Sequence, residues 1–320
     1  MKVVFSTKYR NYARAVVEEV MKVFGSPQAY KEQTWGRELT TKEEIMEIVN
    51  KYMKINRLAV DVYFGQSLVT TMSSNGLSLV GTPNYYREIR FKSLLDHEIG
   101  THYIRSQNHR NMEEDLLRVI KKKRIGWALA TEEGLASLCN HIYYTNCNLF
   151  YIPALLYYAV CISMENSFWD TFKALEKYTI DFNDCWLQTM RVKRGMTDTS
   201  KPGAFCKDQA TFDGSMRIIE NRDAINFPAL FAGKVSLETY NLCEEQLKEA
   251  VSGDEYICPP LIRTKAKREY FMKRVEEIYR AHQELFLRFN NIPVNKMFCN
   301  GPIRPPLSFF GEDAHPHFYE

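Results

Sequence analysis

The chain has 320 residues, of which 42 are Lys or Arg and 39 are Asp or Glu, so its net charge is only +3. This near balance argues against a general nucleic-acid-binding protein, because such binding depends on massed Lys and Arg that release counterions. Hydrophobic residues make up 45% of the sequence and charged residues 25%. That composition is typical of a globular protein with a sizeable core and not of a disordered chain.

The N-terminal region predicts two amphipathic helices. Apolar residues recur at helical spacing from Arg10 to Phe24, and Gly25 follows as a stop signal. Thr41 and Glu44 have the spacing of a capping box, which predicts that a second helix begins there.

The pattern changes to that of a sheet at about residue 57. Residues 57–82 are rich in β-formers and contain Asn75-Gly76, a strong hairpin signal, so we predict a small antiparallel β-sheet. Helical periodicity resumes in a predicted helix over about residues 88–109 and dominates the remainder. We therefore predict an α+β fold, mostly helical, with one domain over residues 1–290 and a Pro-rich tail over 291–320.

An uncharged segment, residues 134–164, raises the question of a membrane span. Its apolar part, 149–164, has only 16 residues and includes Pro153, whereas a spanning helix needs about 20. We expect a buried core helix, in a protein that is not an integral membrane protein. The eight cysteines include no C-x-x-C pair, and the N-terminus has no signal peptide, so we expect reduced thiols and a cytoplasmic location.

Residues 94–102, Leu-Leu-Asp-His-Glu-Ile-Gly-Thr-His, contain the motif H-E-x-x-x-H. The usual zinc-peptidase signature is H-E-x-x-H, with two His one helical turn apart and the Glu as general base. The extra residue places His97 and His102 roughly 140° apart on an ideal helix instead of about 40°. A π-bulge would realign them, and such bulges are common at functional sites. We predict a bulge or break near Gly100.

A catalytic zinc needs a third protein ligand and an open position for water. Thr131-Glu132-Glu133-Gly134 offers two carboxylates at the start of a helix, and Glu133 lies 31 residues after His102. The two Glu side chains point about 100° apart, so only one of them can bind the metal. We expect the other to be a solvated carboxylate favoured by the helix dipole. The small residues that follow would let this helix approach the active-site helix closely.

With these segments in view, the sequence resembles the microtubule-associated tyrosine carboxypeptidases and their relatives, which are zinc metallopeptidases. The resemblance is carried by residues 94–103, 131–137, 154–158, 193–200, 202–205 and 207–209. A weaker likeness extends from about Phe5 to about residue 290. The resemblance implies a zinc enzyme that removes the C-terminal tyrosine of α-tubulin, with Zn2+ as cofactor and microtubules as partner.

The resemblance also assigns roles to individual residues. Carried onto this sequence, it implies that His97, His102 and Glu133 bind zinc and that Glu98 is the catalytic base. The choice of Glu133 over Glu132 comes from the resemblance and not from spacing. The chain starts close to the catalytic domain, without the N-terminal extension seen in relatives, which weakens any expectation of tight binding to the microtubule lattice.

A carboxypeptidase must also bind a terminal carboxylate, which a positioned Arg or Lys does well. Arg191, Arg194 and Lys207 surround a loop that contains Gly and Pro, and we predict that they bind substrate, with Arg194 and Lys207 favoured for the carboxylate. The alternative is a solvated basic loop. Thr211 stands where relatives carry Tyr, so rate or specificity is expected to differ if this position contacts substrate. The strand near residues 77–80 is a candidate to pair with an extended substrate tail.

The predicted function is therefore a zinc-dependent, cytoskeleton-associated carboxypeptidase that acts on the α-tubulin tail. Two alternatives stay open, namely a metallopeptidase acting on another acidic C-terminal tail or peptide, and a non-catalytic module that binds tubulin tails. The small net charge also hides three locally basic segments, 121–124, 191–207 and 263–274. Basic faces near a zinc cleft would steer an acidic tail toward it.

Overall fold

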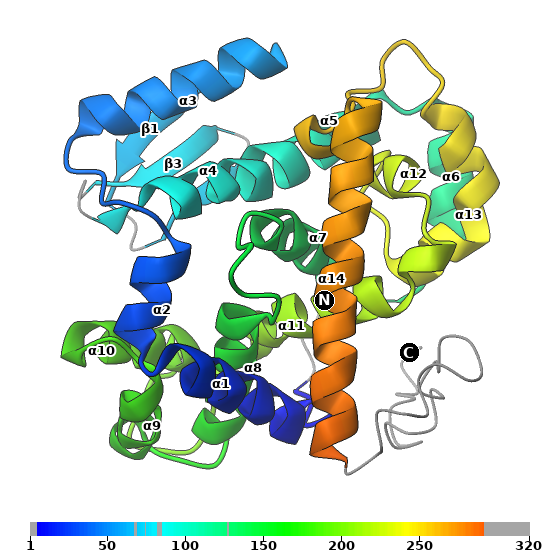
Figure 1. Ribbon diagram of the computed structural model, residues 1–320. Helices are drawn as coiled ribbons and strands as arrows, with labels where there is room; N and C mark the ends of the chain where they lie inside the picture. Colours follow the sequence, from blue (N-terminus) through cyan, green and yellow to red (C-terminus); the bar gives the residue numbers. More distant parts are fainter. Residues whose placement is uncertain (1–4, 67–68, 74, 82–84, 127, 291–320) are drawn as a thin grey trace.

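The computed structural model describes residues 5–66, 69–73, 75–81, 85–126 and 128–290 (Figure 1). The predicted Pro-rich tail, 291–320, lies outside these residues. The described chain is mostly helical and includes one small sheet, which confirms the predicted α+β class.

The elements follow in chain order. The helices are α1 (Arg10–Phe24), α2 (Pro27–Thr34), α3 (Lys42–Asn56), α4 (Glu88–His97), α5 (Ile104–Asn111), α6 (Glu114–Lys122), α7 (Ala128–His141), α8 (Tyr151–Ser163), α9 (Phe168–Leu175), α10 (Phe182–Lys193), α11 (Gln209–Glu220), α12 (Phe227–Phe231), α13 (Leu237–Ala250) and α14 (Lys265–Phe289). The strands are β1 (Val62–Gly65), β2 (Thr71–Ser73) and β3 (Gly76–Val80). A π-helical segment, η2 (Glu98–Tyr103), joins α4 to α5.

Both N-terminal helix predictions are confirmed. Helix α1 ends at Gly25, whose φ of 80° is a left-handed conformation that suits glycine. Helix α3 begins after Thr41, whose side chain accepts a hydrogen bond from the backbone N–H of Glu44. The Glu44 carboxylate reaches back to the N–H of Thr40, one residue before the position that a standard capping box uses.

The sheet differs from the prediction in one respect. Strands β2 and β3 form the predicted antiparallel hairpin, but β1 pairs with β3 in parallel, and the strand order is β1-β3-β2. The sheet is therefore mixed and not antiparallel. Strand β3 lies in the middle, paired with β1 over residues 77–80 and with β2 over residues 76–78. Both edges are therefore occupied at residues 77 and 78, and for these two residues the expectation of pairing with a substrate tail is wrong. The edge strand on that side is β2.

Two cores hold the fold together. The smaller core joins the sheet to its neighbouring helices, and it includes Ile45 of α3, Leu77 and Leu79 of β3, and Phe91 and Leu95 of α4. The larger core joins α1, α7, α8, α11 and α14, and α14 runs along most of the height of the molecule (Figure 1). Helix α4 thus packs on the sheet while its other side faces the helical core.

The uncharged segment forms a core helix, as predicted. Nearly every residue of α8 is buried, including Pro153 in its first turn. No helix in the described part of the chain combines the length and the apolar character needed to cross a membrane. The seven cysteines that the structure describes are all unpaired, which agrees with the expectation of reduced thiols.

Helix α7 is held between α4 and α11, and two glycines allow the second of these contacts. A Cβ on Gly214 of α11 would overlap the carbonyl of Ala130, and a Cβ on Gly134 of α7 would overlap the backbone of Gly214. Gly134 therefore lets α11 approach α7, while Ala136, another of the small residues, contacts His97 of the active-site helix through its backbone.

We expect the substitution Gly214→Ala to lower the free energy of unfolding by about 3 kcal/mol, because the added methyl group meets backbone and the helices must move apart. Urea denaturation measures this difference. The matched control is Gly253→Ala, where a Cβ would meet nothing nearer than 3.4 Å. Equal stability of the two variants would contradict the tight crossing of α7 and α11.

Candidate metal centre

The bulge predicted from the spacing of the two His is present. Residues Glu98–Tyr103 form a π-helical segment between α4 and α5, and the rings of His97 and His102 lie with their centroids 5.0 Å apart. Gly100 is in the middle of this segment. A Cβ there would lie 2.8 Å from the Asp96 carboxylate and 3.0 Å from the Tyr52 hydroxyl, so the packing around the bulge leaves no room for a side chain.

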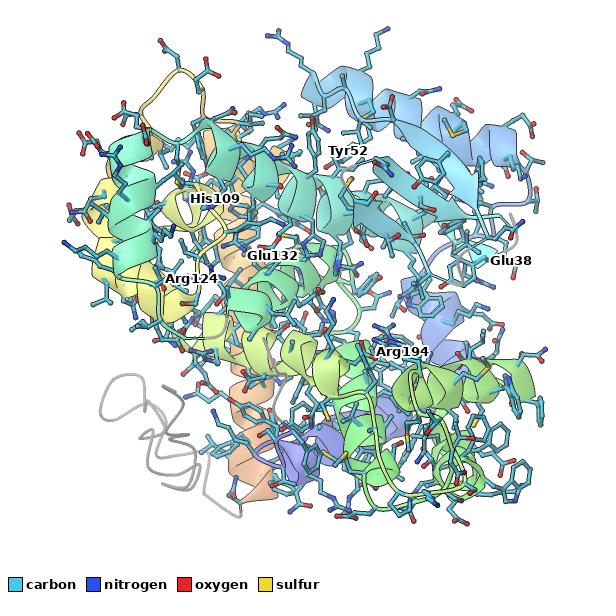
Figure 2. The ribbon with its side chains drawn as sticks, turned by 180° about the vertical axis from the view of Figure 1, so that it is seen from behind. Glu38, Tyr52, His109, Arg124, Glu132 and Arg194 are labelled. Atoms are coloured by element: carbon cyan, nitrogen blue, oxygen red, sulfur yellow. The ribbon has the colours of Figure 1, made fainter. Side chains whose placement is uncertain are left out.

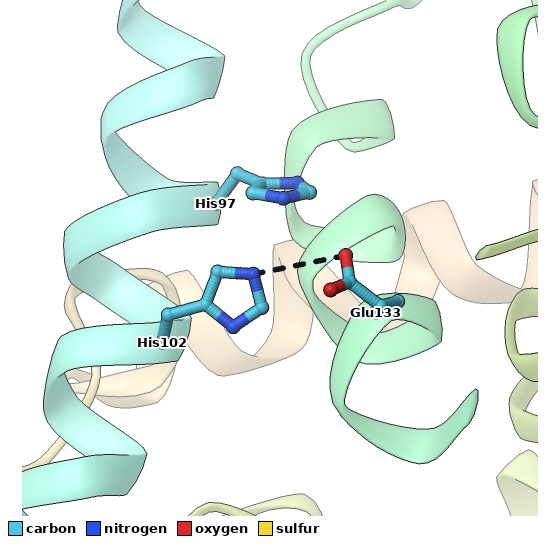
Figure 3. A group of neighbouring side chains, drawn as sticks. All are labelled: His97, His102 and Glu133. Atoms are coloured by element: carbon cyan, nitrogen blue, oxygen red, sulfur yellow. Dashed lines mark ion pairs between the residues drawn. The ribbon is translucent and has the colours of Figure 1, made fainter. Parts of the chain in front are cut away.

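The two His meet a carboxylate from α7. One ligand atom from each of His97, His102 and Glu133 lies within 4.8 Å of the other two, and Nε2 of His102 is 3.9 Å from Oε2 of Glu133. Figure 3 shows both rings projecting from one helix toward Glu133 on α7. Two imidazoles and one carboxylate form a donor set that suits a catalytic zinc with one open position. The sequence named all three residues, and the structure brings them together.

The neighbouring Glu132 is a buried, paired carboxylate, which differs from the expectation. It is buried, its Oε1 lies 2.8 Å from Nδ1 of His102, and its Oε2 accepts a hydrogen bond from Arg105. The Nζ of Lys234 lies 3.4 Å from Oε1. The expectation of a solvated carboxylate is therefore wrong, because α7 turns this side chain toward the centre of the molecule, where Figure 2 shows it.

Arg105 is the partner that sequence reasoning missed. It is fully buried, and its guanidinium also donates to the carbonyl oxygens of Leu230, Gly233 and Val235 at 2.7–3.3 Å. The available signal was its position three residues after His102, which places it one turn further along the same helix. No sequence pattern predicts the contact of Lys234 with Glu132.

The charges around the centre favour a bound cation. Burial lowers the pKa of His97 well below its usual value, and the nearby His102 lowers it further. For His102, burial acts in the same direction, but the hydrogen bond and charge of Glu132, with Glu133 and Glu98, raise its pKa to about 9. The same carboxylates that hold a proton on His102 would attract a metal ion, which competes with that proton.

Glu98 lies beside the donor set. Its Oε2 accepts a hydrogen bond of 3.0 Å from the backbone N–H of Met72 in β2, and its Oε1 is 4.0 Å from Nε2 of His97. Burial raises the pKa of Glu98 to about 7, and the charge of Glu133 contributes to this rise. The edge strand thus fixes one oxygen of this carboxylate and leaves the other facing the site.

One cavity of 780 Å³ is lined by His97, Glu98, His102, Glu132 and Glu133. The predicted substrate-binding residues Arg191, Arg194 and Lys207 line the same cavity, and so does Thr211. Figure 2 places Arg194 at the end of α10, apart from Glu132 at the centre of the molecule. The structure therefore brings the predicted basic residues to the cavity that holds the donor set.

Asp208 organises this basic wall of the cavity. It is buried, and both Arg191 and Arg194 donate two hydrogen bonds to its carboxylate at 2.8–3.1 Å. Although burial opposes it, the two arginines hold the pKa of Asp208 below its usual value. The basic wall thus consists of Arg191, Arg194 and Lys207 around the single carboxylate of Asp208, and it keeps a net positive charge. Asp208 was not predicted, because a lone Asp in a basic segment carries no signal of its own.

Some basic residues of the locally charged segments have structural partners. Lys193 is buried, and its ammonium lies 2.6–3.1 Å from the carbonyl oxygens of Ser163, Asn166, Lys201 and Gly203. Arg274 is also buried and donates to the carbonyls of Ile142 and Tyr144. These two cations hold backbone in place, so they do not contribute to a basic surface.

Fold and site together define an α+β protein whose candidate metal centre lies in a large cavity between the sheet side and the helical core. A family model described as microtubule-associated tyrosine carboxypeptidase matches residues 6–279. The chain belongs to the microtubule-associated tyrosine carboxypeptidase family.

Curated relatives agree with this membership. The chain is 36% identical over 246 residues to microtubule-associated tyrosine carboxypeptidase 1 of Homo sapiens, which covers 73% of this chain and 50% of that protein. It is 32% identical over 299 residues to the Mus musculus protein of the same name, covering 90% and 59%. It is also 32% identical over 280 residues to the putative tyrosine carboxypeptidase MATCAP2 of Mus musculus, covering 85% and 53%. The chain thus spans about half the length of these relatives.

The two adjacent glutamates should respond differently to substitution in metal-free protein. Glu132→Gln removes the charge that balances the buried Arg105, so we expect the free energy of unfolding to fall by about 3 kcal/mol. Glu133→Gln is the matched control, since its one ion pair within the described residues is a 3.9 Å contact with His102, and we expect a change below about 0.5 kcal/mol. Urea denaturation in the presence of a chelator measures both. Equal losses would refute the separate roles.

Proposed function

We propose that this protein is a zinc-dependent carboxypeptidase that removes the C-terminal tyrosine of α-tubulin at cytoplasmic microtubules. The observation that carries the proposal is the convergence of His97, His102 and Glu133 beside Glu98 in one large cavity. The names of the relatives, tyrosine carboxypeptidases associated with microtubules, support the reaction and the substrate.

The roles of the residues follow from the chemistry of hydrolysis. His97, His102 and Glu133 would hold a zinc ion, which would supply polarisation of the scissile carbonyl and a lowered pKa, about 7, for a bound water. Glu98 acts as general base: its Oε1 takes a proton from the attacking water and passes it to the nitrogen of the leaving tyrosine. The hydrogen bond from Met72 occupies Oε2, which keeps the carboxylate oriented for this transfer.

Glu132 and Arg105 position one ligand. The imidazole of His102 donates its Nδ1–H to Glu132, which leaves Nε2, on the side of Glu133, as the nitrogen that would bind a metal. Arg105, held by three backbone carbonyls, fixes the orientation of Glu132 in turn.

The basic wall suits an acidic tail. Arg191, Arg194 and Lys207 carry three positive charges against the single negative charge of Asp208. An acidic peptide that enters the cavity would find complementary charge on this wall, and such complementarity speeds association at low ionic strength.

We expect Glu98→Gln to retain zinc and to lose turnover by about 1,000-fold, because the proton acceptor is removed while the ligands remain. Metal analysis and mass spectrometry of α-tubulin tails, with and without a zinc chelator, measure the two properties. His97→Ala is the comparison variant and should lose zinc and turnover together. A Glu98→Gln protein that cleaves at nearly the wild-type rate would refute the assignment of the base.

The same assay separates the alternative functions. Peptides that end in Glu-Glu-Tyr should lose tyrosine faster than peptides with other C-termini. Equal rates on all acidic tails would indicate a broader metallopeptidase. Zinc-loaded protein that binds the tail and releases no tyrosine would indicate a binding module instead.

A further inference from the structure

Arg90 is a cation of the cavity that neither the motif nor the basic wall accounts for. It lies in α4, seven residues before His97 and four before Leu94. At about 100° per residue these three side chains share one face of the helix, and all three line the cavity. Arg90 therefore lies along the cavity from the candidate metal centre, on the same helix.

The surroundings of Arg90 are aromatic and contain no balancing carboxylate. Its guanidinium lies 4.2 Å from the centre of the Trp35 ring, and Tyr30, Tyr85 and Tyr144 are its neighbours. Within the described parts of the chain, no Asp or Glu lies within ion-pair distance of Arg90. Tyr144 engages part of the guanidinium, and its remaining donors are available for an anion such as a carboxylate.

The basic wall differs from Arg90 in this respect. Arg191 and Arg194 each donate two hydrogen bonds to Asp208. The guanidinium of Arg194 also lies 3.8 Å from the centre of the Phe205 ring. Their positive charge is partly neutralised within the protein. The guanidinium of Arg90 is the better match for a carboxylate that arrives with the substrate.

The spacing also fits the end of a peptide. Seven residues of α-helix separate Arg90 and His97 by about 10.5 Å. A terminal residue in extended conformation is about 3.5 Å long. With one polar contact of about 3 Å at its carboxylate and another at its scissile carbonyl, it spans nearly the distance between Arg90 and His97. Tyr30, Tyr85 and Tyr144, the neighbours of Arg90, line the cavity, and so do the apolar Ile152 and Pro153. That lining suits an aromatic side chain.

We propose that Arg90 is the specificity residue that binds the α-carboxylate of the C-terminal aromatic residue, whose ring lies among Tyr30, Tyr85 and Tyr144. This inference rests on the proposed carboxypeptidase activity. It reassigns the terminal carboxylate from Arg194 and Lys207 to Arg90, and it leaves the basic wall for the acidic side chains that precede the terminal residue. Arg90 would thereby select a free C-terminus over the interior of a chain.

The test compares a peptide ending in Glu-Glu-Tyr with the same peptide carrying a C-terminal amide. Wild-type protein should cleave the free acid with a kcat/KM about 100-fold higher than that of the amide, because the amide cannot accept the bidentate, charge-assisted pair. Arg90→Met should lower kcat/KM on the free acid by a similar factor and change it on the amide less than threefold. Arg90→Lys keeps the charge without the fork and should retain part of the preference.

The control is Arg118→Met. Arg118 is exposed on α6 and does not line the cavity, so this variant loses one positive charge and should keep the wild-type ratio. Equal loss on both peptides in Arg90→Met, or no loss on the free acid, would overturn the proposal. Loss of the preference for Tyr over Phe with an unchanged acid-to-amide ratio would also overturn it, because Arg90 would then contact the phenol. If Arg90→Met does not fold, the ratio in Arg90→Lys decides.

A binding measurement separates this proposal from the proposed activity. Fluorescence anisotropy of the two labelled peptides is followed with zinc-loaded Glu98→Gln protein, with and without Arg90→Met. The free acid should bind at least tenfold more tightly, and Arg90→Met should abolish that difference. If wild-type protein releases no tyrosine but this ratio holds, the proposed activity fails and the role of Arg90 stands. If tyrosine is released but the ratio is one, the role of Arg90 is refuted.

Discussion

Two imidazoles that are five residues apart can face the same point only if the helix between them is widened, and the rest of the site depends on this constraint. The π-helical segment meets it, and Gly100 makes it possible because Asp96 and Tyr52 fill the space beside that position. The widening also sets the direction of everything that follows on the helix. It brings Arg105 to the level of Glu132, where a buried ion pair closes the contact between the two helices.

Helix α7 connects this local geometry to the whole fold. Its adjacent glutamates point in different directions, so one faces the two His while the other is held by Arg105 and supports His102. On its far side, the close approach of α11 at Gly134 and Gly214 fixes how far α7 can rotate or slide. The position of a candidate ligand is thus set by a helix crossing on the side of α7 that faces away from the site.

Local sequence signals predicted much of the fold and part of the site. The spacing of His97 and His102 was enough to predict the bulge, because it is a property of one helix. The choice between Glu132 and Glu133 was not available from spacing, since it depends on the rotation of α7 against its neighbours. The parallel pairing of β1, the role of Arg105 and the placement of Arg90 beside Trp35 depend likewise on contacts between segments distant in sequence.

The buried ammonium of Lys193 has a consequence for recognition. By binding four backbone carbonyls, it ties the loop after α10 to the end of α8, and Arg191 and Arg194 lie within a few residues of this point. Their guanidinium groups are further held by Asp208. Side chains that are already ordered lose little conformational entropy when a ligand arrives. The cost of arranging the basic wall is therefore met during folding, and a flexible acidic tail has only its own disorder to give up.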